Sequence, residues 1–474
     1  MKQADQIYDI QYDKMSPQSI ELFAQRLDKR TLEEVEGIKK IPGEILDVVP
    51  EKRSKGVLGT AVEEFYFGIS PGNSSEPDFK EARVELKTTP VKQNKDKTFS
   101  AKERLSLGMI DYVKEADRTY KESSFYKKNE KLLLMRYLHI PQAQIRNTHF
   151  LSSKLYDLNL LPEEDKKIIR EDWERINHKL KNGLAHELSE GDTYYLSACT
   201  KSSSSETRRR QKHGELAKPR AYSFKQGYMT TLFRREVKKN DDYERVLKKV
   251  EESGEKTFEE YVLDRFKPYL GKKIDDIQKI LDLDVKSGAK NRMPVIARKI
   301  MGVRKKYVEE FESAGILMKT IQVKSNGTPA QAMSFPAFKH AEVIDEQWES
   351  EDDSEMANFR KIIDSRFLFI IIGCEKDCES NEKKILKEVR FWSMSESDKE
   401  IVKEAWEDNI KRIREGRFGE MVKASDERIM HVRPKGTKQN GFETAHNGES
   451  VRKKCFWLNA QYIKNELQKM KVIE

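Results

Sequence analysis

Helical spacing of apolar residues dominates the first part of the chain. Apolar side chains recur three and four positions apart between residues 19 and 40, which predicts a helix over this range with Thr31 as a capping residue. A second predicted helix begins at Lys55 and continues through Phe67. Gly68 is expected to end this helix, because glycine easily adopts the left-handed conformation found after many helices.

Polar and apolar residues then alternate along a short run that predicts a strand. Successive side chains of a strand point to opposite faces, so Glu85 and Lys87 share one face. Leu86 and Val84 share the other face, which is expected to lie in the core. Asp78 lies seven residues before Glu85, which is far enough for a turn to bring its carboxylate back beside the strand.

The same kinds of pattern continue to the end of the chain. The apolar run 132–135 predicts a buried strand, residues 163–180 a helix, and residues 191–200 a further strand. Residues 241–257 belong to a charged stretch with few large apolar side chains, which is typical of a linker. We therefore predict an α/β (α+β) fold with domains at 1–240 and 258–474, joined by this linker.

The second half of the chain repeats features of the first half at a nearly constant distance. Lys319 lies 232 residues after Lys87, and Tyr462 lies 234 residues after Tyr228. A constant offset over this length indicates duplication of a whole domain. Leu317 takes the place of Glu85 in the second copy, and leucine cannot bind a cation. The second copy is therefore expected not to cleave a substrate.

Length and charge add limits to this picture. A chain of 474 residues exceeds one comfortable core, which agrees with two domains. The net charge of +9 favours a polyanionic partner. The longest apolar run, Phe367 to Ile372, is too short to span a membrane, and the first residues contain no hydrophobic signal core. These features predict a cytoplasmic protein with no membrane partner.

Asp78, Glu85 and Lys87 together suggest metal-assisted hydrolysis of a phosphodiester. Carboxylate oxygens are suitable ligands for Mg²⁺, which stabilises charge on a phosphate and lowers the pKa of a bound water. Lys87 is placed to orient that water or to pair with the phosphate. The spacing alone also fits the alternative that these residues are solvated charges on an edge strand.

Two segments carry a resemblance to a known family. Residues 55–68 and the run from Asp78 through Val84-Glu-Leu-Lys-Thr-Thr-Pro90 resemble the mismatch-repair endonuclease MutH and the related GATC-cutting type II restriction enzymes. The two-copy length is similar to the staphylococcal type of these enzymes, which pairs a catalytic domain with a catalytically dead, DNA-binding domain. The resemblance implies two tandem PD-(D/E)xK domains, each a mixed sheet flanked by helices.

The resemblance also implies roles for individual residues. It places Asp78, Glu85 and Lys87 in the catalytic triad, with Asp78 and Glu85 as ligands of Mg²⁺. A helix glutamate of the family falls on Glu63 or Glu64, and a further active-site lysine falls on Lys128 or Lys127.

Candidate DNA contacts follow from the same resemblance. The Arg-Pro-Lys recognition loop of the family reads Cys199-Thr200-Lys201 in the first copy, and Lys225 opens another segment similar to the family. The second copy keeps the full loop, from Arg433 to Lys435. In the second copy, Glu310 stands at the position of Asp78.

These observations favour a bacterial restriction endonuclease that cuts double-stranded DNA at GATC with Mg²⁺. The second domain would hold an effector copy of the DNA, and the monomeric chain would dimerise on DNA. A DNA methyltransferase of the same system is the expected functional partner. The alternatives are a MutH-like enzyme that nicks one strand in repair, and a DNA-binding protein without catalysis.

Overall fold

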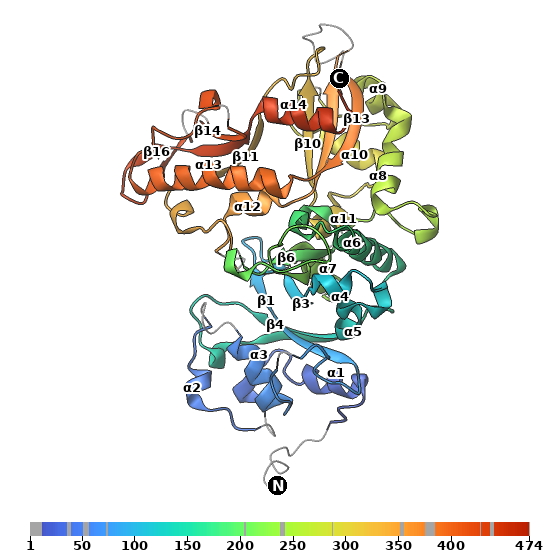
Figure 1. The fold of residues 1–474 in the computed structure, drawn as a ribbon, viewed down its shortest axis with the longest axis vertical. Helices are drawn as coiled ribbons and strands as arrows, with labels where there is room; N and C mark the ends of the chain where they lie inside the picture. The colour runs from blue at the N-terminus through green and yellow to red at the C-terminus, as the bar shows by residue number, and fades with distance from the viewer. Residues whose placement is uncertain are drawn as a thin grey trace. The chain divides into compact units, whose positions relative to one another are not determined.

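A computed structural model describes residues 12–35, 39–50, 56–72, 74–202, 205–237, 242–286, 288–350, 355–374, 384–426, 428–436 and 440–473. The chain forms two compact units, which Figure 1 shows by colour along the sequence. The first unit comprises the described residues of 1–185 and 195–240. The second comprises residues 186–194 and the described residues from 242 onward. Each unit has its own hydrophobic core.

The first unit contains a four-stranded sheet in the order β2-β1-β4-β5. β1 (Val84–Gln93) runs parallel to β4 (Lys131–Leu138), and β4 pairs antiparallel with β5 (Phe150–Asp157). β2 (Phe99–Ala101) pairs only with the far end of β1. The first residues of β1 thus have β4 as their neighbour within this sheet, which keeps one side of the strand available for a turn.

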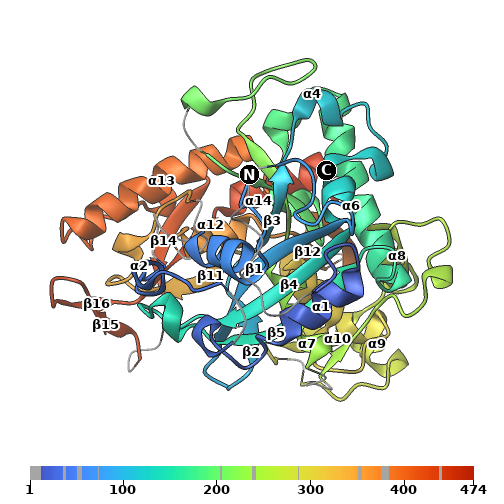
Figure 2. The ribbon, with the colours of Figure 1, turned by 90° about the horizontal axis from the view of Figure 1, so that it is seen from below.

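Helices cover this sheet and shape the start of β1. α1 (Pro17–Gln25) lies against β5 (Figure 2), and Glu21 of this helix accepts a hydrogen bond from the backbone of Leu155. α3 (Val57–Ala61) continues directly into the π-helical turn η2 (Val62–Tyr66). A side-chain carbon on Gly59 would come within 3.3 Å of Thr88 Oγ1, so glycine allows α3 to pack closely on β1.

A second sheet completes the first unit. Its order is β3-β7-β6, formed by β3 (Leu105–Met109), β7 (Arg220–Phe224) and β6 (Leu196–Thr200), all antiparallel. The helices of this part are α2 (Gly43–Leu46), α4 (Tyr112–Glu115), α5 (Ser124–Asn129), α6 (Glu163–Lys181) and α7 (Gln226–Glu236).

The second unit contains two three-stranded sheets with corresponding pairings. In one sheet, β10 (Leu317–Val323) runs parallel to β12 (Phe367–Gly373), which pairs antiparallel with β13 (Ile385–Trp392). The other has the order β11-β17-β14, from strands Met333–Phe338, Lys454–Leu458 and Met430–Pro434. Short pairs join β8 (Tyr243–Glu244) to β9 (Tyr307–Val308) and β15 (Phe442–Thr444) to β16 (Ser450–Arg452).

Helices flank both sheets of the second unit. α13 (Glu396–Arg414) runs beside β11 and β14, whereas α10 (Arg292–Ile300) lies beside β10 (Figure 1). The others are α8 (Phe258–Phe266), α9 (Ile274–Ile280), α11 (Glu309–Ala314), α12 (Asn358–Ile363) and α14 (Ala460–Lys469). No helix in the described part of the chain is long and apolar enough to cross a membrane.

Two elements expected from the sequence pattern need correction. The helix predicted over 19–40 ends at Gln25, and Lys29 has a φ of 64°, which interrupts helical geometry before a short 3-10 turn that Thr31 caps. Residues 36–38 of that range, and Lys55, lie outside the described residues. The strand expected over 191–200 begins only at Leu196.

The segment expected to be a linker is part of the second unit. Within residues 242–257, β8 pairs with β9, and Val246 and Leu247 are buried. Both of these residues donate backbone hydrogen bonds of 3.0 Å to the carboxylate of Glu310. The low content of large apolar residues suggested a free connector, but a few buried contacts and one carboxylate are enough to fix the segment.

Candidate active site

A tight turn before β1 returns Asp78 to the strand, as the spacing predicts. Phe79 and Val84 pair through two backbone hydrogen bonds of 2.9 and 3.1 Å, and Arg83 adopts a φ of 54° within the turn. Asp78 Oδ2 then accepts a 2.8 Å hydrogen bond from the backbone N–H of Leu86. This bond fixes the Asp78 carboxylate beside the first residues of β1.

Two lysines converge on the buried carboxylate of Glu85. Lys87 Nζ lies 2.5 Å from Glu85 Oε1, which confirms that residues 85 and 87 share a face of the strand. Lys128 Nζ, from α5, lies 3.4 Å from the same oxygen, and it also donates a 2.7 Å hydrogen bond to the carbonyl of Ser74. The Glu85 side chain is only 1% exposed. Its burial raises the pKa of the carboxyl group, and the charge of Lys87 opposes this rise.

Glu63 interacts electrostatically with the cluster formed by Asp78, Glu85, Lys87 and Lys128. Burial, followed by the negative charges of Asp78 and Glu85, raises the pKa of Glu63 to about 7, whereas Lys87 and Lys128 lower it. Glu63 lies in the π-helical turn η2, and such turns often occur at functional sites. Three carboxylates and two ammonium groups therefore influence one another at the start of β1.

The structure distinguishes the neighbouring residues that the sequence left as alternatives. Glu64 lies 3.6 Å from Lys39 in a half-exposed ion pair. Lys127 is exposed, whereas the adjacent Lys128 reaches Glu85. The contact with Glu85 places Lys128 in the cluster, whereas Glu63 is linked to it through its pKa, which burial and then the charges of Asp78 and Glu85 raise.

The cluster fits a hard cation. Glu85 Oε2 is buried and has no hydrogen-bond partner among the described residues, which is unfavourable for a carboxylate oxygen and leaves it able to bind a cation. The described residues contain no ready-made group of three or more His, Cys, Asp or Glu that could hold a metal. Mg²⁺ commonly uses only one or two protein carboxylates and takes its other ligands from water and substrate phosphate. Asp78 and Glu85 are suited to that mode.

Two features of the site were not predicted from the sequence. The carbonyl of Ser74 anchors Lys128, but Ser74 lies in a loop whose residue types give no indication of this contact. The π-helical turn at Glu63 was also missed, because helical apolar spacing does not separate an α-helix from one wide turn.

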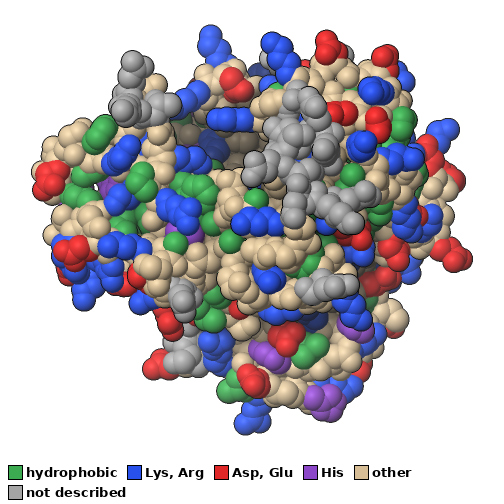
Figure 3. Space-filling view, turned by 90° about the horizontal axis from the view of Figure 1, so that it is seen from above, with side chains coloured by type: hydrophobic (Ala, Val, Ile, Leu, Met, Phe, Trp, Pro, Cys, Tyr) green, Lys and Arg blue, Asp and Glu red, His purple; other side chains and the backbone are tan. Residues whose placement is uncertain are grey.

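The candidate DNA contacts occupy strand ends and a helix start. In the first unit, Lys201 follows β6 and Lys225 precedes α7, and both side chains are half-buried. In the second unit, the exposed Arg433 lies over the ring of Trp457, with its guanidinium carbon 5.3 Å from the ring centroid. Lys435 Nζ donates a hydrogen bond to the carbonyl of Phe335. Figure 3 shows many Lys and Arg side chains on the face in view, interspersed with Asp and Glu.

The corresponding region of the second unit has different chemistry. Leu317 is the first residue of β10, and Lys319 shares its face of the strand. Glu310 does not approach β10 as Asp78 approaches β1, because its carboxylate accepts the backbone N–H groups of Val246 and Leu247. Its complete burial raises its pKa to about 7. This glutamate therefore holds the residues that precede α8 instead of joining a catalytic cluster.

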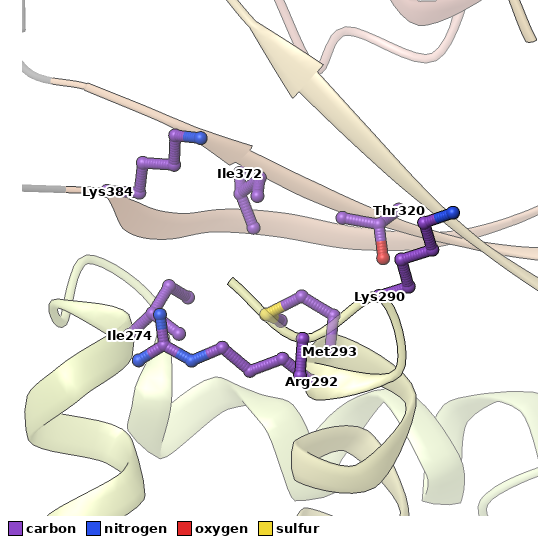
Figure 4. A pocket seen from close by; sticks show the side chains of 8 residues that line it. Ile274, Lys290, Arg292, Met293, Thr320, Ile372 and Lys384 are labelled. Atoms are coloured by element: carbon purple, nitrogen blue, oxygen red, sulfur yellow. The ribbon is translucent and has the colours of Figure 1, made fainter. Parts of the chain in front are cut away.

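A separate cavity of about 180 Å³ lies between α9, α10 and the β10–β12 sheet of the second unit (Figure 4). Three cations line it, but Arg292 is paired with Asp275 and Lys384 donates to Gln322. The other labelled side chains around it are Ile274, Lys290, Met293, Thr320 and Ile372. This cavity has no carboxylate in its lining and does not resemble the cluster at β1.

Comparison with known proteins agrees with this geometry. The family described as "DNA mismatch repair enzyme MutH" matches residues 67–172, which include β1, β4 and α5. The type II restriction enzyme Sau3AI of Staphylococcus aureus is 34% identical over 435 residues, covering 86% of this chain and 87% of that protein. The mismatch repair protein MutH of Vibrio campbellii is 24% identical over 165 residues, covering 34% of this chain and 69% of that protein.

The mixed α/β fold and the carboxylate–lysine cluster at a parallel strand define a nuclease with a MutH-like domain. The extent of the match to Sau3AI then makes the assignment specific. The chain belongs to the MutH-related type II restriction endonucleases and is a site-specific deoxyribonuclease.

Proposed function

We propose that this enzyme hydrolyses double-stranded DNA at GATC sites, with Mg²⁺ as its cofactor and the cluster at β1 as its active site. The arrangement of Glu85 carries the proposal. The ammonium groups of Lys87 and Lys128 lie 2.5 and 3.4 Å from Glu85 Oε1. The other oxygen, Oε2, is buried without a hydrogen-bond partner among the described residues. The relatives support restriction activity, and the GATC sequence rests on the family resemblance.

Each residue of the cluster has a separate task in this proposal. Asp78 and Glu85 would hold the cation, and Mg²⁺ when bound supplies charge stabilisation at the phosphate and a more acidic water. Lys87 Nζ stays beside Glu85 and is placed to orient the attacking water or to pair with a phosphate oxygen. Lys128 is held by Ser74 and adds positive charge on the same side. Glu63 adds a third carboxylate beside Asp78.

We further propose that the two units are tandem copies of one PD-(D/E)xK-like domain. Each has a parallel strand pair followed by an antiparallel one, and each has a three-stranded antiparallel sheet. The long helices α6 and α13 both contain 19 residues. The second copy has Leu317 in place of Glu85, so it would bind an effector copy of the DNA without cutting it. Two chains would assemble on DNA, and a methyltransferase of the same system would protect the host.

Incubation of supercoiled plasmid with the enzyme and Mg²⁺ tests this function. Linear fragments with ends at GATC are expected, because a restriction enzyme breaks both strands at its site. Accumulation of nicked circles alone would support strand nicking of the MutH kind, and unchanged plasmid would support DNA binding without catalysis. Omission of the divalent cation is the control, and cleavage without it would contradict the assigned cofactor.

We expect Glu63→Gln to slow cleavage about tenfold to a hundredfold, because it removes a carboxylate charge beside Asp78. The matched change Glu64→Gln should stay within about twofold, since Glu64 pairs with Lys39 outside the cluster. Initial cleavage rates at saturating Mg²⁺ measure both effects. Equal losses in the two variants would remove Glu63 from the site.

A second matched pair concerns the lysines of α5. Lys128→Met should lower the cleavage rate about tenfold or more, because a charge 3.4 Å from Glu85 is lost. Lys127→Met, at the exposed neighbouring position, should change the rate by less than about twofold. The assay is the same plasmid cleavage, with circular dichroism to check folding. A larger loss in the Lys127 variant would reverse the assignment.

A further inference from the structure

Two lysine side chains of the second unit end at neighbouring carbonyl groups of β11. Lys319 Nζ, from β10, donates a 2.7 Å hydrogen bond to the carbonyl of Ser334. Lys435 Nζ, which follows β14, donates to the carbonyl of the next residue, Phe335. Lys319 and Lys435, which are far apart in the sequence, therefore both bring an ammonium group to β11.

The position of Lys319 corresponds to that of the catalytic candidate Lys87. β10 pairs with β12 in the way that β1 pairs with β4, so that Leu317 lies opposite Phe367 and Glu85 lies opposite Leu132. Lys319 stands two residues after Leu317, as Lys87 stands two residues after Glu85. In the first unit the lysine has a carboxylate at 2.5 Å, whereas here that carboxylate is replaced by an apolar side chain.

The two ammonium groups therefore place positive charge close together without a carboxylate partner among the described residues, although Lys319 Nζ also lies 4.8 Å from the ring centroid of Phe335. Neither forms an ion pair with an Asp or Glu among the residues that the structure describes. Burial, and then the charge of Lys435, lowers the pKa of Lys319 to about 8, while the nearby Cys455 raises it. Lys399, a fully buried lysine of this unit, shows the usual arrangement, with carboxylate oxygens of Asp364 and Glu396 at 2.6 and 2.8 Å.

We propose that Lys319 and Lys435 form a phosphate-binding site through which the second unit holds the backbone of effector DNA. This inference rests on the proposed effector function, and it names the residues that would hold the backbone of the effector DNA. Each ammonium has three donors and uses one on a carbonyl, which leaves donors for phosphate oxygens. Because two like charges that are partly withdrawn from water repel each other, a bound phosphate relieves the repulsion between these half-buried lysines.

The surroundings of the pair suit DNA. Arg433 lies two residues before Lys435, is exposed, and is braced on Trp457, so it can reach a base or a second phosphate. Leu317 cannot bind a cation, so the phosphate at this position is bound but not cleaved. The former catalytic position thereby becomes a site for binding alone.

Thermal unfolding of the full-length protein with added inorganic phosphate tests the lysine pair directly. Phosphate should raise the unfolding midpoint of the wild type more than that of Lys319→Met or Lys435→Met. Lys411→Met, which removes an exposed lysine of α13, should keep the full gain. The difference between wild type and Lys319→Met should shrink as pH rises above 8, because Lys319 loses its proton and no longer attracts an anion. Equal gains in all variants would overturn the site.

DNA binding in the Glu85→Ala background separates this inference from the proposed function. That chain should bind two short GATC duplexes, measured by sedimentation or calorimetry. Adding Lys319→Met should weaken the second binding event about tenfold and reduce its salt dependence, while leaving the first event unchanged. Lys319→Arg should restore part of the affinity, because it restores the charge.

The possible outcomes are distinct. Binding of a single duplex by the Glu85→Ala chain would refute the effector function itself, whatever the phosphate experiment gives. Two unchanged binding events in the Lys319→Met chain would overturn the phosphate site and leave the effector function standing. A phosphate-dependent midpoint that requires Lys319, combined with unchanged DNA binding, would show a site for free phosphate and would refute the DNA assignment.

Discussion

Asp78→Ala and Glu85→Ala should each reduce DNA cleavage by about a thousandfold or more while leaving DNA affinity within about threefold. A catalytic cation contributes several kcal/mol of transition-state stabilisation, which corresponds to this loss of rate. Each change removes a carboxylate that would hold the cation. Binding energy comes mostly from contacts of Lys and Arg with phosphates, which these changes leave in place.

The turn between these two residues supplies a matched control. Glu81 is exposed on the same turn, and Glu81→Ala should retain nearly full activity. The measurement is the initial cleavage rate at saturating Mg²⁺, together with DNA affinity at a fixed salt concentration. Substantial cleavage by both Asp78→Ala and Glu85→Ala would refute the assigned site. Residual cutting that disappeared on mutation of the second unit would show that the second unit is not catalytically dead.

A plasmid with a single GATC site should be cut about tenfold more slowly than a plasmid with two sites, and added GATC oligonucleotide should restore the rate. One active unit cuts one strand, so a double-strand break requires a second chain or a second event. Binding of effector DNA to the second unit is expected to stabilise the active assembly. Coupling energies between sites are typically about 1–3 kcal/mol, or about 5-fold to 150-fold in rate or affinity.

Substitution of the second unit tests whether that unit causes the effect. The double change Arg433→Ala with Lys435→Ala should weaken stimulation, because it removes two cations beside Trp457 and Phe335. The charge-matched control removes two exposed lysines of α13 and α14, Lys411 and Lys469, and should preserve stimulation. Equal rates of the wild type on both plasmids would rule out an effector site and leave the second unit as a clamp or a support.

The sequence by itself predicted much of the first unit. Strict alternation over residues 84–87 was enough to place Glu85 and Lys87 on one face, because the side-chain period of a strand is two. The seven-residue spacing to Asp78 was enough to predict a returning turn. The apolar run at 132–135 predicted the buried strand β4, and the periodic pattern over 163–180 predicted the helix α6.

Only the tertiary structure decided between adjacent candidates. Spacing cannot separate Glu63 from Glu64, because a π-helical turn shifts the direction of every side chain within it. Spacing also cannot separate the exposed Lys127 from Lys128, which reaches Glu85. The packing of α5 decides which of its side chains points toward the cluster.

Contacts between distant segments could not be predicted from the sequence either. Ser74 anchors Lys128 across 54 residues, and Lys435 reaches Phe335 across 100. Residues 242–257, expected to be a linker, are held by Glu310 in the same long-range manner. Local patterns specify elements and faces, whereas the meeting of side chains from different elements depends on packing, which no local pattern contains.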